Sequence, residues 1–194
     1  AAINPIVEVV RGERTATITL ELATAFCRAT GKRPLLCRDS YGFAINRFFC
    51  PYSNEAVRLL DEGLGDPALI DAAARTAVGA AAGPFAVMNI IKPRINLDAV
   101  RNLAPLGPFY APATSLVTVG EAGGTWDIGR APAPAAPVTP IVDRLRGAVF
   151  LAVLEELDEA VAVPGDIDMG ARDALRFADP PRVLMDRLGR HEGA

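Results

Sequence analysis

Two polar residues in this chain stand where a side chain could take part in chemistry. Glu8 is the single acid in the apolar run INPIVEVV, residues 3–10. Such an acid is either a catalytic carboxylate or a residue of a strand edge or interface. Asn46, in the stretch FAINR, is either a group that binds a substrate oxygen or a residue that caps a helix start. On these residues alone both alternatives stay open.

Histidine, cysteine and paired acids supply few further candidates. His191 is the only histidine and lies in the polar C-terminal tail, so a histidine base would have to come from a partner segment. Three cysteines without CxxC spacing (Cys27, Cys37 and Cys50) argue against zinc and against a disulfide framework. Asp166 and Asp168 lie at a predicted helix start, where capping is a simpler role than metal binding. We therefore expect no metal site.

Composition excludes several classes of partner. The 194 residues are 51% hydrophobic and 22% charged, which is enough for a buried core. The net charge is −3 and no dense Lys/Arg cluster occurs, so nucleic acid is not an expected partner. The longest apolar stretch, residues 77–91, is interrupted by Gly, Pro and Asn and is too short to span a bilayer. Without a signal-peptide pattern and with unpaired cysteines, a cytoplasmic location is expected.

The first forty residues alternate between strand and helix patterns. Residues 3–10 and 33–38 read as short apolar strands. Because strands do not stand alone, a start on the single strand 3–10 suggests that its sheet lies upstream and that this chain is a fragment. Thr15 is the expected N-cap of the helix between them, and Gly31 its end. The apolar positions of that helix are Ile18, Leu22, Ala25, Phe26 and Ala29.

From Phe43 onward the pattern is helical. We predict a helix over 43–61 that bends or restarts at Pro51, then helices beginning at Asp66-Pro67 and Gly83-Pro84, and two more over 96–103 and 112–121. Residues 131–140 hold four prolines and are expected to form an extended linker. Trp126 is expected to pin this linker to the core. Glu155, Glu156, Asp158 and Glu159 are expected to form a solvated helix face.

The second half of the chain repeats the first at an offset of 97 residues. Without a gap, 12 identities fall between Asn46 and Ile91 and their counterparts. We interpret this as an internal helical duplication. The matched positions are Arg47/Arg144, Leu60-Asp61-Glu62/Leu157-Asp158-Glu159, Pro67/Pro164, Ile70-Asp71/Ile167-Asp168, Ala74-Arg75/Ala171-Arg172, Ala77/Ala174, Pro84/Pro181 and Met88/Met185.

Four segments, taken in order, resemble the 3-hydroxyacyl-CoA dehydrogenase family. They are IVEVVRGERT (6–15), ATGKRPLLCRDSYGFAINRFFCPYSNEA (29–56), GDPALIDAA (65–73) and AGPF (82–85). Each is weak alone, but the combination in this order is specific. The family pattern is an LVEVV strand, a GK-x-P turn and D-x-PGF-x-x-NR at the start of the helical domain. Residues 142–189 resemble the second helical repeat of the larger members.

The resemblance implies a mainly α fold of two tandem helical repeats, like the C-terminal domain of 6-phosphogluconate dehydrogenase, preceded by short strands left over from a Rossmann domain. It implies an NAD-dependent L-3-hydroxyacyl-CoA dehydrogenase of fatty-acid β-oxidation as the parent enzyme, with NAD on a domain missing from this chain. Glu8 matches the Glu of a His–Glu dyad whose His lies upstream in an H-x-x-N-P motif. Asn46 matches the Asn beside the substrate carbonyl.

Several positions depart from the family pattern. Tyr41 replaces the Pro before Gly-Phe, and Asn89 replaces an Asp. The second copy has Asp143 where the first has Asn46 and Pro180-Pro181 where the first has Gly83-Pro84, so we expect it to be structural.

The expected organisation has four parts: the end of the NAD-binding domain with a connecting helix (1–38), the first repeat (39–130), the linker (131–140) and the second repeat (141–194). The expected partners are a 3-hydroxyacyl-CoA substrate, the absent Rossmann domain and an enoyl-CoA hydratase domain fused to it. The chain itself is expected to be an inactive, monomeric internal pseudo-dimer. Two alternatives are a non-catalytic helical assembly module and a dehydrogenase of similar architecture acting on a 3-hydroxy acid without CoA.

Overall fold

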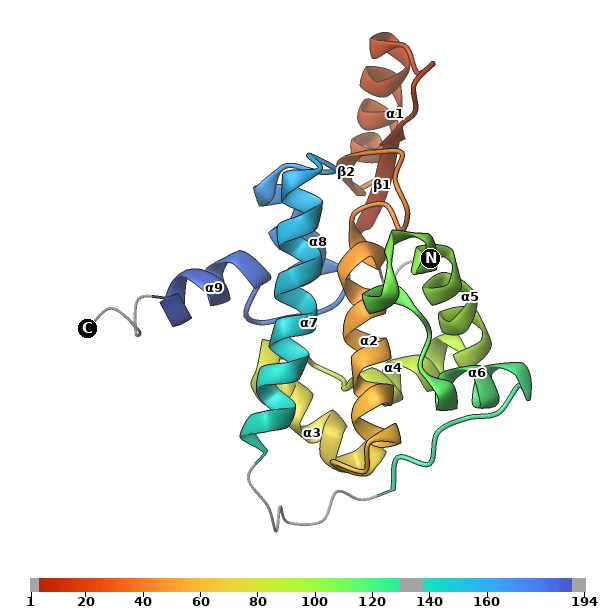
Figure 1. Cartoon of the computed structure of the whole chain (residues 1–194). Helices are drawn as coiled ribbons and strands as arrows, with labels where there is room; N and C mark the ends of the chain where they lie inside the picture. The colour runs from red at the N-terminus through yellow and green to blue at the C-terminus, as the bar shows by residue number, and fades with distance from the viewer. Residues whose placement is uncertain (1–3, 130–137, 190–194) are drawn as a thin grey trace.

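A computed structural model describes residues 4–129 and 138–189 of the chain. Two strands and a helix are followed by a body of helices (Figure 1). The strands are β1 (Ile6–Arg11) and β2 (Arg33–Arg38), and single-turn 3-10 helices lie at Ala104–Leu106 and Pro108–Tyr110. The α-helices are α1 (Thr17–Ala29), α2 (Ile45–Asp61), α3 (Pro67–Val78), α4 (Pro84–Ile91), α5 (Pro93–Leu103), α6 (Thr114–Glu121), α7 (Thr139–Asp158), α8 (Pro164–Asp173) and α9 (Pro181–Gly189).

The strands β1 and β2 are parallel neighbours joined through α1. The predicted second strand is confirmed, whereas the first is Ile6–Arg11 and does not begin at residue 3, which lies outside the described part. Thr15 is not the N-cap of α1, because its Oγ1 accepts a hydrogen bond from the Gly12 amide and the helix starts two residues later. A strand–helix–strand unit therefore precedes the helical body.

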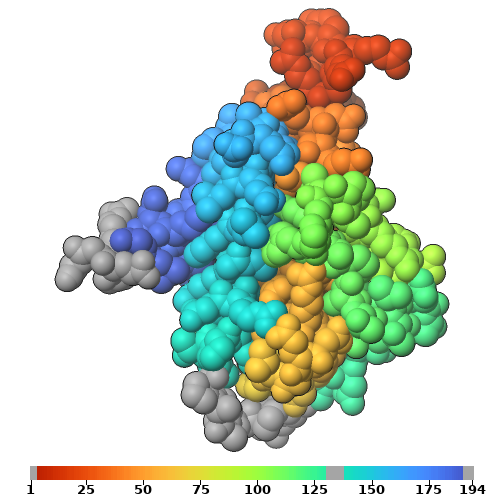
Figure 2. All heavy atoms as spheres, in the orientation of Figure 1, coloured from red at the N-terminus to blue at the C-terminus, as the bar shows by residue number. Residues whose placement is uncertain are grey.

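One face of α1 is left uncovered by the described part of the chain. Leu20 and Cys27 pack on Val9, but the predicted apolar positions Ile18, Leu22 and Phe26 are 59%, 64% and 69% exposed. In Figures 1 and 2 the red α1 segment stands out from the rest of the molecule. The predicted helix is therefore confirmed. Its predicted apolar positions face outward, because Leu20 and Cys27, on another side of the helix, make the contact with the sheet.

The helices α2 and α7 lie side by side at the centre of the body (Figure 1). Of the two predicted effects of Pro51, a restart does not occur, since α2 runs unbroken from Ile45 to Asp61, and a bend stays a prediction. Pro51 is buried, so packing on both sides holds this part of the helix in place. The predicted N-cap of α3 is confirmed, because the Asp66 carboxylate accepts from the Leu69 amide at 2.8 Å.

The helix boundaries of the two halves coincide at the offset of 97 residues. The helices α3 and α8 start at Pro67 and Pro164, and α4 and α9 start at Pro84 and Pro181. The central helices α2 and α7 both end at the matched aspartates, Asp61 and Asp158. The helices predicted over 96–103 and 112–121 correspond to α5 and α6 and fall between the two halves.

The end of the predicted linker is helical. The helix α7 starts at Thr139, with Pro140 in its first turn, where the missing proline N–H leaves no hydrogen bond unmade. Linker residues 131–137 and His191 lie outside the described residues. Among the helices of the described part, none combines the length and apolarity that crossing a bilayer requires.

Trp126 is held in the core, whereas residues 131–137 of the linker that it was expected to pin lie outside the described residues. Its side chain is 7% exposed and packs edge-on against Phe85, with ring centroids 5.0 Å apart. The Asn89 amide group donates to the Trp126 carbonyl at 2.9 Å and accepts from the Trp126 amide at 2.8 Å. An aspartate could accept but not donate, so this pair explains why Asn89 suits the position.

Candidate functional site

Glu8 of β1 is bound to the start of α2. Its Oε1 accepts hydrogen bonds from the backbone amides of Ala44, at 2.8 Å, and Ile45, at 2.9 Å. The helix has no side-chain cap of its own, so Glu8 fills the place of an N-cap from another element. Burial raises the pKa of Glu8, and the two amides oppose this shift. A carboxylate is thus held in a half-buried position with its charge favoured by the helix start.

A turn with strained backbone angles, at Gly42 and Phe43, places the first residues of α2 next to Glu8. Gly42 and Phe43 both have positive φ, 79° and 51°. A Cβ on Gly42 would lie 2.9 Å from the Arg47 amide nitrogen and from Leu103 Cδ2, so only glycine fits. Tyr41, which replaces the family proline, is 51% exposed. The turn therefore fixes the helix start through Gly42 without needing a rigid residue at position 41.

Asn46 lies at the second position of α2 and is exposed. It follows Ile45 directly, so the structure brings the two predicted site residues, Glu8 and Asn46, to the same helix end. Their catalytic roles stay predictions.

A buried arginine lies next along α2. Arg47 is 1% exposed, and its Nη2 donates to Glu159 Oε1 at 2.5 Å. Its guanidinium carbon lies 5.4 Å from the centre of the Tyr110 ring, and the Tyr110 hydroxyl donates to Glu155. Arg47 thus joins α2 to α7 beside the Glu8 end of the helix.

The predicted solvated acidic face of α7 is wrong for one of its residues. Glu156 is fully buried, and neither carboxyl oxygen has a hydrogen-bond partner among the described residues. The helical spacing indicates that Glu156 is buried, because residue 156 continues the series of buried positions Leu145, Val149 and Ala152. Sequence reasoning missed Glu156 because an acid among other acids resembles part of a solvated face.

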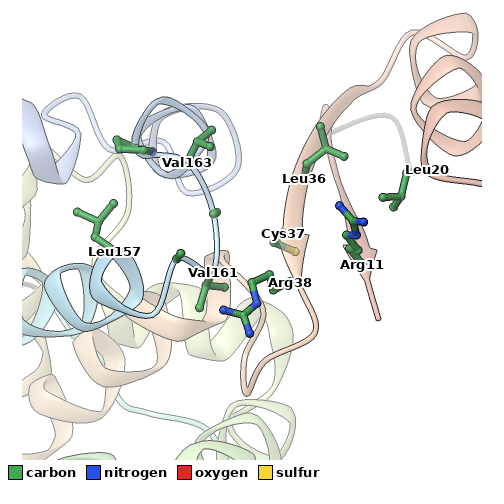
Figure 3. Close-up of a pocket in the computed structure, with 11 residues that line it drawn as sticks. Arg11, Leu20, Leu36, Cys37, Arg38, Leu157, Val161 and Val163 are labelled. Carbon is green, nitrogen blue, oxygen red and sulfur yellow. The ribbon is translucent and has the colours of Figure 1, made fainter. Parts of the chain in front are cut away.

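A groove of about 600 Å³ lies between β2 and the α7–α8 region. Figure 3 shows Leu36, Cys37 and Arg38 of β2 on one side, and Leu157, Val161 and Val163 from the α7–α8 region on the other. Here the Arg38 amide donates to the Val161 carbonyl at 2.8 Å. Glu8 and Asn46 do not line this groove, so it is separate from the candidate site.

The turn between β1 and α1 does not resemble a dinucleotide-binding turn. The β1–α1 connection carries one glycine, Gly12, and lacks the glycine-rich turn that cradles a dinucleotide. Within the described residues, no three His, Cys, Asp or Glu side chains are grouped so that they could hold a metal ion. Asp168 accepts instead from the Arg182 amide at the start of α9, at 3.2 Å, so it caps the helix that follows its own. All three cysteines are buried and free.

This arrangement is that of a helical domain whose first long helix is seated on a carboxylate from an adjoining strand–helix–strand unit. Residues 42–125 match the family described as 3-hydroxyacyl-CoA dehydrogenase, C-terminal domain, in agreement with the resemblance seen in the sequence.

Named relatives agree with this assignment. The chain is 33% identical over 114 residues to the mitochondrial hydroxyacyl-coenzyme A dehydrogenase of Mus musculus, covering 57% of this chain and 36% of that protein. It is 36% identical over 96 residues to the 3-hydroxyadipyl-CoA dehydrogenase of Escherichia coli, covering 50% of this chain and 20% of that one. The match thus spans about a third or less of these two relatives.

A solved structure shares the fold over nearly the whole chain. The 3-hydroxybutyryl-CoA dehydrogenase of Escherichia coli superposes with a TM-score of 0.83 at 18% identity, covering 97% of this chain and 61% of that one. The architecture therefore extends beyond the segment matched by sequence and includes the α7–α9 half.

Proposed function

We propose that this chain is the substrate-side portion of an NAD-dependent L-3-hydroxyacyl-CoA dehydrogenase that acts in fatty-acid β-oxidation. The observation that carries the proposal is the seating of Glu8 on the first turn of α2, directly beside Asn46. These two residues match the dyad acid and the substrate-binding amide of the family. NAD and the catalytic histidine would be held by a nucleotide-binding domain and not by residues 1–194.

Glu8 would orient the catalytic histidine and stabilise its protonated form. Oxidation of a secondary alcohol needs a base for the hydroxyl proton, and imidazole has a suitable pKa. One oxygen of Glu8 is engaged by two amides, which leaves the other to accept from the imidazole and stabilise its protonated form. The exposed amide of Asn46 can donate to the carbonyl oxygen of the substrate.

The exposed face of α1 supports a domain packed against it. Ile18, Leu22 and Phe26 form one stripe along the helix, four residues apart. A nucleotide-binding domain that continues the two-stranded sheet would cover this stripe and place its histidine near Glu8. Fusion to an enoyl-CoA hydratase domain stays a prediction.

The two helical halves support an internal duplication that acts as a pseudo-dimer. Asp71 accepts from the amides of Phe85 and Ala86 at the start of α4, and Asp168, its counterpart, accepts from the start of α9. In such a chain each half covers the surface through which the other would pair with a second molecule. We therefore propose that the chain does not form a homodimer through this surface.

A chimeric enzyme tests the proposed function. The chain would be joined to the nucleotide-binding domain of the Escherichia coli 3-hydroxybutyryl-CoA dehydrogenase, and NADH production from 3-hydroxybutyryl-CoA would be followed by absorbance. We expect turnover by the chimera and none by the chain alone. NADH production by the chain alone at an enzyme-like rate would contradict the assignment of the histidine and NAD to another domain. A folded chimera without turnover would contradict the activity itself.

A further inference from the structure

Glu156 is a buried acid that the proposed mechanism does not use. It lies on the face of α7 that packs against α2, with no exposed surface and no hydrogen bond to either oxygen from the described residues. Buried carboxyls normally have partners, and an unpaired one is costly when ionised. Its counterpart in the first half is Leu59, which is also fully buried. The helix pairing can thus accept a leucine at this place, and packing does not explain the acid.

The groups around Glu156 come from four elements. Arg47 of α2 lies within electrostatic range of Glu156, and its Nε and Nη1 have no hydrogen-bond partner among the described residues. Its Nη2 is bound to Glu159, just beyond Glu156 at the end of α7. The Glu8 carboxylate of β1 and the Cys37 thiol of β2 lie within electrostatic range. Glu156 thus lies within electrostatic range of one guanidinium, Arg47, and of two further carboxylates, Glu8 and Glu159, and acids placed in this way do not all ionise together.

The hydrogen bonds decide which acid is charged. Glu8 accepts from two backbone amides at a helix start, and Glu159 pairs directly with Arg47 and is 44% exposed. Glu156 has neither kind of support. Burial raises the pKa of Glu156 to about 9, Arg47 opposes the shift, and the Glu8 carboxylate adds to it.

We propose that Glu8 and Glu156 form a carboxyl pair in which Glu156 holds the proton and Glu8 holds the charge. Glu156 is then a positioning residue of the dehydrogenase site, supplied by the second helical half, and this functional meaning rests on the function proposed above. By remaining neutral, Glu156 leaves Glu8 as the ionised carboxylate that a neighbouring imidazolium requires. The second half thus contributes to the site although its own Asp143 replaces Asn46.

Carbon-13 NMR of the 194-residue chain with labelled glutamate carboxyl carbons tests the pair. In the wild type one glutamate should titrate near pH 9, and Glu156→Gln should remove that signal. Glu8→Gln should move the Glu156 midpoint to lower pH by about one pH unit, because it removes the like charge. Asp158→Asn, an exposed change on the same helix, should leave it in place. A Glu156 midpoint in the ordinary carboxyl range, or one that Glu8→Gln does not move, would overturn the proposal.

Infrared spectroscopy gives a second measurement if a variant folds poorly. The wild-type chain at pH 7 should show the carbonyl stretch of a protonated carboxylic acid, and this band should disappear as the pH is raised well past the Glu156 midpoint. Its absence at pH 7 would overturn the proposal. Both measurements use the chain without cofactor or substrate. A failed turnover assay would therefore count against the dehydrogenase function and leave the carboxyl pair standing, and the reverse also holds.

Discussion

Arg47 and Glu159 form an ion pair between the two helical halves, and the same pair recurs with the halves exchanged. Arg47 lies on α2 and Glu159 follows α7, whereas Arg144 on α7 reaches Glu62 after α2. Arg144 is 97 residues beyond Arg47, and Glu159 is 97 beyond Glu62. An exchange of this kind is what a two-fold axis between the halves produces.

A short antiparallel bridge has the same exchanged pattern. Ala80 pairs with Phe177, its own counterpart at the offset of 97. The Ala178 amide donates to the Gly79 carbonyl at 3.1 Å, and the Ala81 amide donates to the Arg176 carbonyl at 3.3 Å. These two hydrogen bonds are also related by exchanging the halves, which supports the proposed duplication.

The first prediction concerns oligomeric state. Because α2 and α7 cover each other, light scattering at micromolar concentration should give the monomer mass of 20.4 kDa. Self-association through the exposed α1 stripe would be a separate effect and should disappear in Leu22→Glu. A stable dimer that persists in Leu22→Glu would contradict the internal pairing.

The second prediction concerns a close approach at the start of α4. A Cβ on Gly83 would lie 2.2 Å from the Asp71 carboxyl carbon, and this carboxylate binds the amides of Phe85 and Ala86. Gly83→Ala should therefore lower the free energy of unfolding by about 1–3 kcal/mol. Gly147→Ala, within α7, should raise it by about 0.5–1 kcal/mol, because a Cβ added there would meet no atom within 4 Å. Equal effects in urea titrations would show that the Asp71 contact is not as tight as described.

The third prediction uses the single tryptophan. Asn89→Asp removes the donor to the Trp126 carbonyl and places a carboxylate against it. Trp126 should loosen from Phe85, and its fluorescence maximum should move to longer wavelength. Asn102→Asp, an exposed change on α5, should leave the spectrum unaltered. An unchanged spectrum in Asn89→Asp would mean that the two hydrogen bonds do not hold the segment.

The fourth prediction concerns stability against pH. Burial raises the pKa of Glu156 from 4.5 to about 9, so the folded chain binds this proton more tightly than the unfolded chain does. The resulting stabilisation is complete below pH 4.5 and is lost as the pH rises toward 9. The slope is at most about 1.4 kcal/mol per pH unit. Glu156→Gln should flatten this dependence, and Asp158→Asn should keep it. A wild-type unfolding free energy that rises between about pH 5 and pH 9 would contradict the raised pKa.

Local patterns predicted much of the fold. The second strand, the Asp66 N-cap and the helix boundaries after Pro67 and Pro84 follow from local rules that depend on a few neighbouring residues. Thr15 failed as a cap because its hydroxyl bonds to Gly12 within a turn, a competing local choice of similar energy.

The site depended on contacts that local patterns do not encode. Glu8 and Asn46 are 38 residues apart, and only the turn at Gly42-Phe43 brings them to one helix end. Glu156 was missed because an acid beside other acids resembles part of a solvated face, and the helix that covers this side of α7, α2, belongs to the other half of the chain. Periodicity indicates which side of a helix is buried, but not that an acid on that side remains unpaired.

The most direct test of the central claim is the turnover rate of Glu8→Gln in the dehydrogenase formed by this chain and a nucleotide-binding domain. Glutamine keeps the acceptor for the Ala44 and Ile45 amides but removes the charge that stabilises the imidazolium. We expect kcat to fall by about 10²-fold or more with a smaller change in KM. Glu13→Gln, an exposed change beside the same strand, should keep the wild-type rate. A near-wild-type kcat in Glu8→Gln would contradict the account and reduce Glu8 to a cap of α2.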